Sequence, residues 1–556
     1  MQNYWYDTIR HYTERLVAIR SVSPGVGENR VVGEVLRMLH ANGLESVYAS
    51  SGLDPLPGDP WERHNAFAFL RGLSPRTIVL LGHIDTVDTA DYESLEPWAL
   101  DPAGLAARQN VLAELTPGLA EDHAAFPGDW MFGRGSADMK SGLAVNIAVM
   151  RHLAGIARAG RLPLSVVFLA TPDEENESAG VLQAVHFLLH LRQQYGLEYL
   201  GAINTDTTLA LYPGDEHRYI FTGTAGKLLP SFLVIGRASH VGTPFEGIDA
   251  NLLAAELIRD LSMNDELCDV AGEQITAPPV TLHASDLKDR YDVQLPYMAY
   301  FYLNVLTFTS EPGELLERLR LWAGSALERV LQQIDETERR WLLLSGDDTR
   351  AEQHRSRSSI VLTYAELLSE VWQRLGPERV QAELATMLEN MPGELDARQR
   401  CLRLVRHLWT LSGQEGNFKY GPAVVIYYSP PYYPHVAATP CLLHKVVGAV
   451  AAAHPELNLK VQEYYPFISD ISYLRLNPDM DLAALTANIP TWREPDRPAY
   501  PGTYSLPLAA IQQLGLPVVD IGPYGRSVHQ RDERVLMSYS FGVLPQLICE
   551  VIERLG

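Results

Sequence analysis

The residues of this chain that could do chemistry are histidine and acidic side chains in short polar clusters, each beside an apolar segment or a glycine-rich turn. Imidazole and carboxylate ligands together suit Zn, Co or Mn, because softer metals prefer thiolates. The clusters are far apart in sequence, so the folded chain must bring them together. The candidate metal ligands are His83, Asp138, Glu175, Asp206 and His529.

Asp138 is the central candidate. It lies in the glycine-rich stretch Gly133–Gly142, immediately before the apolar, helix-forming segment Leu143–Ala154. Glycine lets the backbone bend tightly around a carboxylate, and the two carboxylate oxygens are enough to contact two metal ions. The stretch could therefore hold a bridging ligand in a rigid turn, although taken alone such a sequence is more often a solvated turn.

The five candidates divide into two sets of ligands that share Asp138. One ion would take His83, Asp206 and one oxygen of Asp138. The other would take His529, Glu175 and the second oxygen. Three neighbouring carboxylates would repel one another unless cations neutralise them. An open position on each ion would leave room for a shared water.

Two acids next to these ligands have separate expected roles. Asp85, two residues after His83, would accept a hydrogen bond from the ring nitrogen that does not bind metal. Glu174, next to Glu175, would take the proton of the attacking water and pass it to a leaving amine.

Taken singly, each of these residues also has an ordinary structural explanation. Asp138 and Asp206 could cap a helix or a turn, and adjacent acids such as Glu174 and Glu175 are commonly just solvated. A serine hydrolase has little support, because Ser136 lies in GRGSAD and the chain has no GxSxG elbow.

The elements that must position these residues are buried strands that end in polar clusters. Two-residue periodicity places His83 and Asp85 on the same side at the carboxyl end of a strand, where open α/β sheets bind ligands. Helical patterns cover residues 29–42 and 179–194. The stretch 96–130 has the composition of a surface loop. The predicted strands are 65–70, 77–82, 164–170, 198–204 and 517–521.

The predicted domain organisation is discontinuous. Residues 1–215 and 430–556 form an α/β domain, and residues 216–429 form an inserted α+β domain with a helical addition over about 340–415. The Pro- and Tyr-rich segment 429–434 separates the two. Strands are expected at 227–235, 297–307 and 422–428, and helices at 249–261, 311–340, 442–453, 506–514 and 539–555. The segment 351–410 is expected to be mostly helical.

Composition limits the classes of partner. The 556 residues carry a formal charge of −23, which argues against nucleic acid or an anionic membrane as a partner. The four scattered cysteines suggest neither disulfides nor a thiolate zinc site. The first residues lack the hydrophobic block of a signal peptide, and no apolar run reaches membrane-spanning length. A cytoplasmic location is expected.

The order of the motifs resembles the M20 family of dinuclear zinc peptidases and deacylases. The motifs are GHIDTVD, GRGSADMKSG, TPDEENESAG, an acid about thirty residues later, and GRSVHQRDERV. In the second domain, Ser239-His240 with Pro244, Gly247 and 249–251 also resembles that family. The length, the helical addition and NVLTFTSEP most resemble its arginine-utilisation branch, the Roc-type proteins.

The resemblance implies an α/β zinc-peptidase fold, with a mixed sheet covered by helices on both faces and an inserted α+β lid or dimerisation domain. It implies two Zn²⁺ ions, with Co²⁺ or Mn²⁺ as alternatives, bridged by Asp138, and Glu174 as general base and acid. The peptide bond after Asp138 would be cis. His240 would steady the developing oxyanion, in many relatives from a partner subunit. Where many relatives carry an arginine for the substrate carboxylate, this chain has Tyr302-Leu303-Asn304-Val305.

The expected function is therefore metal-dependent hydrolysis of an amide bond in an amino-acid derivative or short peptide, with a link to arginine utilisation. The alternative is a metal- or ligand-binding protein that keeps the M20 fold without catalysis. A homodimer through the inserted domain is also expected from the resemblance.

Overall fold

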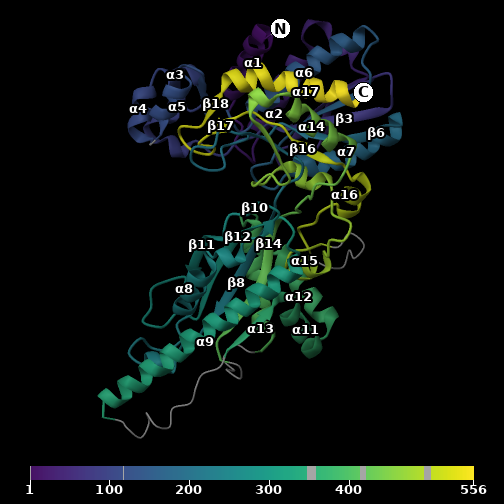
Figure 1. The fold of residues 1–556 in the computed structure, drawn as a ribbon. Coiled ribbons are helices and arrows are strands. Elements are labelled where there is room, and N and C mark those ends of the chain that lie inside the picture. Colours follow the sequence, from purple (N-terminus) through teal and green to yellow (C-terminus); the bar gives the residue numbers. More distant parts are fainter. Residues whose placement is uncertain (1, 117, 347–358, 414–420, 494–501) are drawn as a thin grey trace. The chain divides into compact units, whose positions relative to one another are not determined.

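The computed structural model describes residues 2–556, apart from 117, 347–358, 414–420 and 494–501. The chain forms two compact units, which Figure 1 colours along the sequence. Unit 1 comprises Met1–Thr224, Val436–Asn477 and Pro507–Gly556. Unit 2 comprises Ala225–His435 and Pro478–Leu506.

Unit 1 is built on an eight-stranded mixed sheet with the order β1-β2-β5-β3-β6-β16-β7-β15. Its central strands are parallel, and β1 and β2 pair in antiparallel fashion at one edge. The strands are β1 (Ser50–Pro55), β2 (His64–Leu70), β3 (Arg76–His83), β5 (Ser165–Thr171), β6 (Glu198–Asn204), β7 (Arg218–Phe221), β15 (Leu459–Gln462) and β16 (Val518–Asp520).

The apolar strand β3 lies between β5 and β6 and is buried along nearly its whole length. Consecutive apolar residues suit this position, because both faces of a central strand are covered. In the parallel register His83 is opposite Thr171, and Leu81 is opposite Asn204. The polar segments that follow these three strands therefore begin at the same edge of the sheet.

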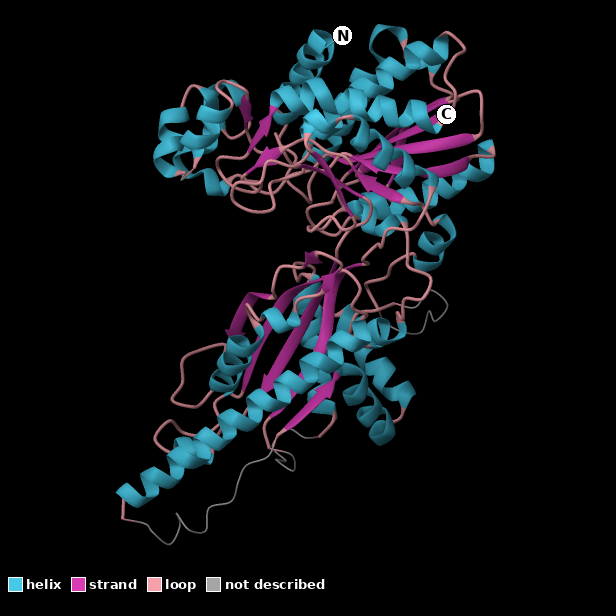
Figure 2. Cartoon of the chain, in the orientation of Figure 1, coloured by secondary structure: helices cyan, strands magenta, loops and turns pink. Residues whose placement is uncertain are grey.

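Helices cover both faces of this sheet, as predicted (Figure 2). Ile78 and Leu80 of β3 belong to the same apolar core as α6, α14 and α17, whereas Phe67 of β2 packs on Phe187 of α7, with 4.5 Å between ring centroids. The helices of unit 1 that form these layers are α1 (Gln2–Val17), α2 (Gly27–His40), α6 (Lys140–Arg158), α7 (Ala179–Tyr195), α14 (Leu442–Ala453), α16 (Leu508–Leu514) and α17 (Leu544–Leu555).

A small three-stranded sheet links two distant parts of unit 1. Strand β18 (Arg534–Leu536) pairs with both β17 (Gly525–Arg526) and β4 (Trp130–Phe132). This pairing brings the glycine-rich stretch that follows β4 close to the loop between β17 and β18. The two segments contain Asp138 and His529.

The prediction of a surface loop over residues 96–130 is wrong, because most of this segment is helical. It contains α3 (Pro102–Ala106), α4 (Gln109–Leu115) and α5 (Leu119–Ala125). Asp101 caps α3 by accepting the N–H of Gly104, with a proline at the first helical position. Helices of five to seven residues between Pro and Gly show too little periodicity to be told from loops.

Unit 2 has a five-stranded sheet with the order β11-β12-β8-β14-β13. All of its pairings are antiparallel except that of β13 with β14. Strand β14 continues to Tyr433, within the segment 429–434 that sequence composition had marked as a break. The strands are β8 (Gly226–Ile235), β11 (Val280–Asp286), β12 (Met298–Thr307), β13 (Ile360–Thr363) and β14 (Ala423–Tyr433); a hairpin of β9 (Val270–Ala271) and β10 (Gln274–Ile275) lies outside this sheet.

Helices also pack on both faces of the unit 2 sheet. The helices α8 (Ala250–Leu261) and α9 (Pro312–Leu344) contact one face (Figure 1). The helical addition consists of α11 (Tyr364–Leu375), α12 (Pro377–Glu389) and α13 (Ala397–Leu411), which share a second core with inward residues of β8, β12 and β14. The segment 351–410 was expected to be mostly helical. Its described part contains these three helices and also the strand β13, whereas 351–358 lie outside the described residues.

The unit boundaries differ from the expected domain limits. Strand β7 belongs to the large sheet of unit 1, although residues from 216 were assigned to the inserted domain. Residues 478–506, including α15 (Ala483–Ala487), belong to unit 2, although they follow the chain's return to unit 1. Hydrogen bonds of Asn488 tie this segment to unit 2. The backbone carbonyl of Asn488 accepts the N–H of Tyr428, and its side-chain oxygen accepts the N–H of Ala365.

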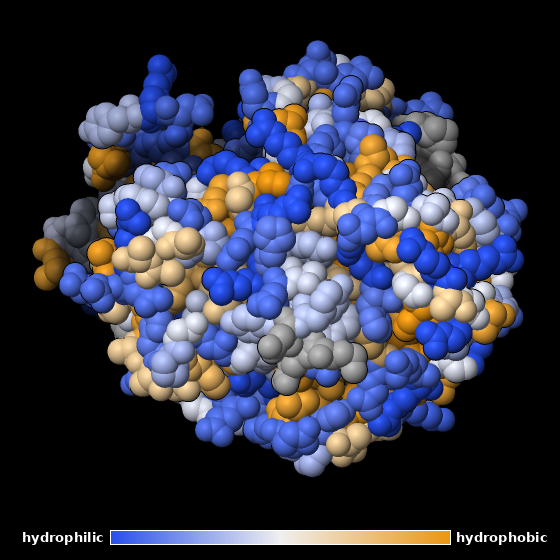
Figure 3. Space-filling model, turned by 90° about the horizontal axis from the view of Figure 1, so that it is seen from above, coloured by the Kyte–Doolittle hydropathy of each residue, from blue (hydrophilic) through white to orange (hydrophobic). Residues whose placement is uncertain are grey.

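The surface seen from above is a mixture of hydrophilic and hydrophobic side chains, with the hydrophobic ones in small groups (Figure 3). Among the described residues, no helix has both the length and the apolar character needed to cross a bilayer.

We expect the helical addition to contribute strongly to the stability of unit 2. Leu408 of α13 is fully buried in the second core. Leu408→Ala should lower the free energy of unfolding by about 2–5 kcal/mol, because it removes buried methyl groups and leaves a cavity. Urea unfolding followed by tryptophan fluorescence would measure this. Leu321→Ala is the control, because Leu321 on α9 is 67% exposed, and it should change the free energy of unfolding by less than about 0.5 kcal/mol. Equal changes in the two variants would contradict the prediction.

Candidate functional site

The site lies at the edge of the unit 1 sheet where β3, β5 and β6 end. His83 is the last residue of β3 and is buried, and its Nε2 lies 2.9 Å from Oδ1 of Asp138. Asp138 comes from the turn before α6, and the peptide bond after it is cis, as the resemblance implied. Gly135 in this turn has φ +78°, a conformation that favours glycine.

The second oxygen of Asp138 faces a different histidine. Nε2 of His529 lies 3.3 Å from Asp138 Oδ2 and 2.9 Å from Glu175 Oε1. His529 has φ +61°, in the left-handed region that non-glycine residues rarely adopt and that is frequent at functional sites. Asp138 therefore lies between two imidazoles, one against each oxygen.

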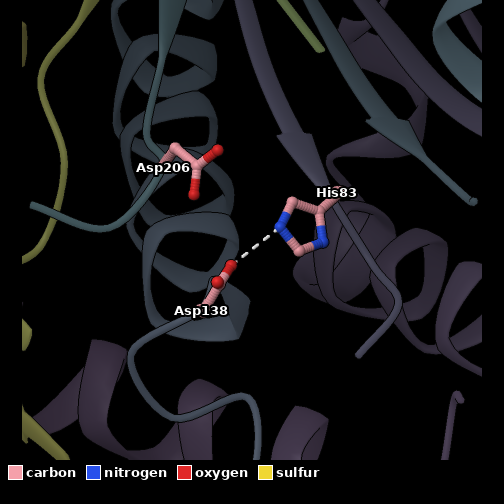
Figure 4. A group of neighbouring side chains, drawn as sticks. All are labelled: His83, Asp138 and Asp206. Carbon is pink, nitrogen blue, oxygen red and sulfur yellow. Dashed lines mark hydrogen bonds and ion pairs between the residues drawn. The ribbon is translucent and has the colours of Figure 1, made fainter. Parts of the chain in front are cut away.

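Asp206 completes the group around His83. It follows β6, and its side chain points into the space shared with His83 and Asp138 (Figure 4). Oδ2 of Asp206 accepts the hydroxyl of Ser469 at 3.1 Å. Gly522 makes this packing possible, since a Cβ there would lie 1.4 Å from the carbonyl oxygen of Asp206.

The structure gathers the predicted residues into three overlapping groups of potential metal ligands. Within each group the ligand atoms all lie within 4.8 Å of one another. Glu174 belongs to one group, so its carboxylate is close to those of the proposed ligands. The groups are His83, Asp138 and Asp206; His83, Glu174 and Glu175; and Asp138, Glu175 and His529.

The electrostatics of the site reflect this crowding of carboxylates. Burial, together with the negative charge of Asp138, raises the pKa of Asp206 to about 7. Burial and the neighbouring acids Glu175 and Asp206 raise the pKa of Glu174 well above its usual range. Asp138 differs, because hydrogen bonds from the two histidines outweigh the effect of burial and lower its pKa.

Asp85 holds the loop after β5 rather than the ring of His83. Nδ1 of His83 is 3.6 Å from Asp85 Oδ1, longer than a hydrogen bond, so the expected bond is not formed. The carboxylate of Asp85 instead accepts two backbone amides, from Glu174 at 3.2 Å and from Glu175 at 3.0 Å. One buried acid thus fixes the peptide that carries both glutamates.

Glu533 performs a similar task for Asp138. It is fully buried, and its Oε1 accepts the amides of Ala137 at 3.1 Å and Asp138 at 3.2 Å. Its Oε2 forms an ion pair with Arg134 at 2.8 Å. Arg134 also contacts Asp91 at 2.7 Å. Hydrogen bonds and an ion pair of Glu533 therefore join the glycine-rich stretch to the segment after His529.

Sequence reasoning missed three of the polar residues around the site. Asp520 accepts the amide of Asp206 at 3.0 Å, and Asp470 accepts the hydroxyl of Thr171 at 2.9 Å. Ser469 contacts Asp206, as described above. For Ser469 and Asp470 the available signal was a charged residue inside the largely apolar run FISDISYL, since a charged residue is rarely buried without a specific partner.

His240 belongs to unit 2 and lies in an exposed turn. Its Nδ1 accepts the backbone N–H of Gly242 at 3.0 Å. In the neutral ring this bond leaves the proton on Nε2, which is then a hydrogen-bond donor.

The donor set fits divalent metal ions. Two imidazole–carboxylate contacts, one at the buried His83 and one at the exposed His529, and four acids in a small volume supply N and O ligands of the kind that Zn²⁺, Co²⁺ and Mn²⁺ accept. The four acids also need positive charge beyond that of the two histidines. Nδ1 of His83 is buried and has no hydrogen-bond partner among the described residues, and its contact with Asp85 is 3.6 Å long.

The chain is similar to known proteins over most of its length. The model of peptidase family M20/M25/M40 matches residues 79–539. The chain is 31% identical over 555 residues to Protein RocB of Bacillus subtilis (strain 168), which covers 98% of this chain and 94% of RocB. It is 32% identical over 486 residues to YqjN of the same organism, covering 86% and 84% of the two chains.

The fold is also similar to a solved structure, that of aminopeptidase PepT from Bacillus cereus ATCC 10987. The TM-score is 0.52 and the identity 12%, with 99% of this chain and 98% of that chain covered. The family match over most of the chain and the full-length likeness to RocB decide the classification. The chain belongs to peptidase family M20/M25/M40 and is a metallohydrolase of the M20 type.

Proposed function

We propose that this protein hydrolyses an amide bond in an amino-acid derivative or short peptide with the help of two bound Zn²⁺ ions. The observation that carries the proposal is the position of Asp138, whose two oxygens face His83 and His529 separately. A carboxylate placed in this way suits a bridge between two ions. Co²⁺ or Mn²⁺ would suit the same oxygen and nitrogen ligands.

The proposed ligand sets share Asp138. His83 and Asp206 would hold one ion with it, and Glu175 and His529 the other. Bound there, two divalent ions would supply an activated water and polarise the scissile carbonyl. The crowded carboxylates support this assignment, because neutralising cations relieve their repulsion.

Glu174 is the proposed general base and acid. Its backbone is held by Asp85, and its side chain lies close to His83 and Glu175. It would take a proton from the attacking water and deliver it to the leaving amine. Burial raises the pKa of Glu174, which makes its carboxylate a stronger base toward the proton of the attacking water.

The substrate proposal rests on likeness to relatives. The full-length similarity to RocB supports an amino-acid derivative, and we propose a role in arginine utilisation. A part of the chain is also 29% identical, over 225 residues, to the succinyl-diaminopimelate desuccinylase of Wolinella succinogenes, which supports amide hydrolysis of an acylated amino acid. A cytoplasmic location is proposed as well, since none of the four cysteines forms a disulfide.

His240 is proposed to stabilise the developing oxyanion. Its Nε2 is available as a donor because Nδ1 is occupied by Gly242. We further propose a homodimer through unit 2, where β11 is an edge strand of the sheet. Val280 and Leu282 on this strand are 42% and 56% exposed, and an unpaired apolar edge can pair with a second copy.

Replacing Glu174 and Asp138 should separate chemistry from metal binding. Glu174→Gln should lower kcat by about 10²–10⁴-fold and leave about two metal ions per chain, because the base is lost and the ligands remain. Asp138→Asn should lose both ions and all turnover. Turnover assays would measure the loss of activity in both variants, and elemental analysis would measure their metal content. The proposal would be contradicted if Glu174→Gln kept the parental turnover, or if Asp138→Asn retained two ions.

Glu533→Gln should weaken metal binding although Glu533 is no ligand. A single amide oxygen cannot serve two backbone amides and Arg134 together, so Asp138 should lose its alignment. The dissociation constant for Zn²⁺, measured against a competing chelator, should rise about 10–100-fold. Glu553→Gln, at an exposed position on α17, is the control and should bind normally. Equal affinities for the two variants would show that Glu533 does not position the site.

The proposed role of His240 can be tested by mixing variants. His240→Ala and Glu174→Gln should each be nearly inactive. If His240 acts across a dimer, subunit exchange should restore about one quarter of parental turnover, because half of the dimers are mixed and each has one intact site. Mixtures that stay inactive, although native mass spectrometry detects mixed dimers, would place His240 in its own subunit's site or outside catalysis.

A further inference from the structure

A second buried charged cluster lies in unit 1, apart from the candidate metal ligands. Its centre is Arg63, which precedes β2 and is 3% exposed. Three carboxylates surround this guanidinium, from Glu28 in the first turn of α2, from Asp59 and from Asp173 after β5. The active-site proposal uses none of these four residues.

The contacts converge on Asp173. Nη1 of Arg63 lies 2.5 Å from Asp173 Oδ1, and its Nη2 lies 2.7 Å from Asp59 Oδ1. Oε1 of Glu28 accepts the backbone N–H of Asp173 at 2.9 Å. The hydroxyl of Ser23 donates to Asp173 Oδ1 at 3.0 Å. Asp173 is therefore fixed through both its side chain and its backbone.

Asp173 has φ +75°, in the left-handed region, so its backbone must be held there by its surroundings. Its carbonyl accepts the N–H of Ser178 at 2.6 Å, and its Oδ2 accepts that of Ala179 at 3.1 Å. These bonds close a short loop over residues 173–178. Glu174 and Glu175 lie within that loop.

The loop is consequently held from two sides. Asp85, at the end of β3, accepts the amides of Glu174 and Glu175. Arg63 and Glu28 hold the residue immediately before them. A buried cluster with more carboxylates than cations is a poor source of stability, because desolvation offsets the attraction. We therefore expect this cluster to orient the loop rather than to stabilise the fold.

We propose that Arg63 and Glu28 are positioning residues that act through Asp173 to set the direction of the Glu174 carboxylate. The consequence for catalysis rests on the proposed function of Glu174, whereas the effect on the loop does not. A displacement of about 1 Å at a reacting group can cost about 10²-fold in rate. Loss of the guanidinium should therefore affect kcat far more than substrate binding.

The first experiment is amide hydrogen exchange on the full-length, metal-free protein. Arg63→Gln should speed exchange of the Glu174 and Glu175 amides about tenfold or more, since their loop loses one of its two anchors. Arg192→Gln is the matched control, because Arg192 donates to the carbonyls of Gln513 and Leu514 in the same unit but contacts nothing in the loop. Unchanged exchange in Arg63→Gln, or the same change in both variants, would overturn the proposal.

The second experiment uses a substrate that the parent enzyme cleaves. Arg63→Gln should lower kcat about 10²-fold with KM within about twofold, and should shift the acid limb of the pH profile of kcat/KM. Arg63→Lys should restore part of the rate. An equal loss for the Gln and Lys variants, or a change in KM alone, would contradict a positioning role.

A milder variant covers the case in which Arg63→Gln does not fold. Ser23→Ala removes the hydroxyl shared by Asp173 and Glu28, and should change exchange and kcat in the same direction but less. Parental values for Ser23→Ala together with Arg63→Lys would overturn the proposal. If the parent enzyme cleaves no amide substrate, the proposed function is wrong. The hydrogen-exchange result alone would then test the role of Arg63 and Glu28.

Discussion

The site depends on one carboxylate that lies between two imidazoles. Asp138 presents one oxygen to His83, from the middle of the large sheet, and the other to His529, from a loop near the end of the chain. This arrangement requires that two loops meet with little freedom. The small sheet of β4, β17 and β18, together with the buried pair of Arg134 and Glu533, supplies that constraint.

Buried acids recur as anchors of the ligand-bearing loops. Asp85 accepts the amide of Glu175, Glu533 accepts that of Asp138, and Asp520 accepts that of Asp206. In each case a second carboxylate fixes the peptide of a proposed ligand. A carboxylate is well suited to this, because its two oxygens can serve more than one donor. The acidic residues therefore divide into those that face the site and those that hold its backbone.

Unit 2 has a sheet whose two faces are covered by different sets of helices. Its sheet is covered on one face by α8 and α9 and on the other by the helical addition α11–α13, which also supplies the edge strand β13. The addition thus gives the sheet a second core of its own. The opposite edge strand, β11, keeps exposed apolar residues and is the edge that we propose for pairing with a second copy.

The sequence by itself determined the order of the motifs, the central strands and the family. Strand β6 and helix α14 have the bounds predicted from apolar runs, and the clusters at the ends of β3, β5 and β6 identified His83, Glu175 and Asp206 as candidates. These features are local, because hydrophobic periodicity and glycine-rich turns are encoded within a few residues. Short helices over 102–125 escaped prediction because five to seven residues carry too little periodicity.

Only the tertiary structure decided which acids hold the site together. Asp138 and its anchor Glu533 are 395 residues apart in sequence, and Asp206 and Asp520 are 314 apart. Such contacts join a side chain to the backbone of a distant segment, so they leave no pattern along the chain. Residues 478–506 joined unit 2 for the same reason, through hydrogen bonds of Asn488 that no local signal reveals. Composition and spacing select the residues able to do chemistry, whereas packing decides which of them support the others.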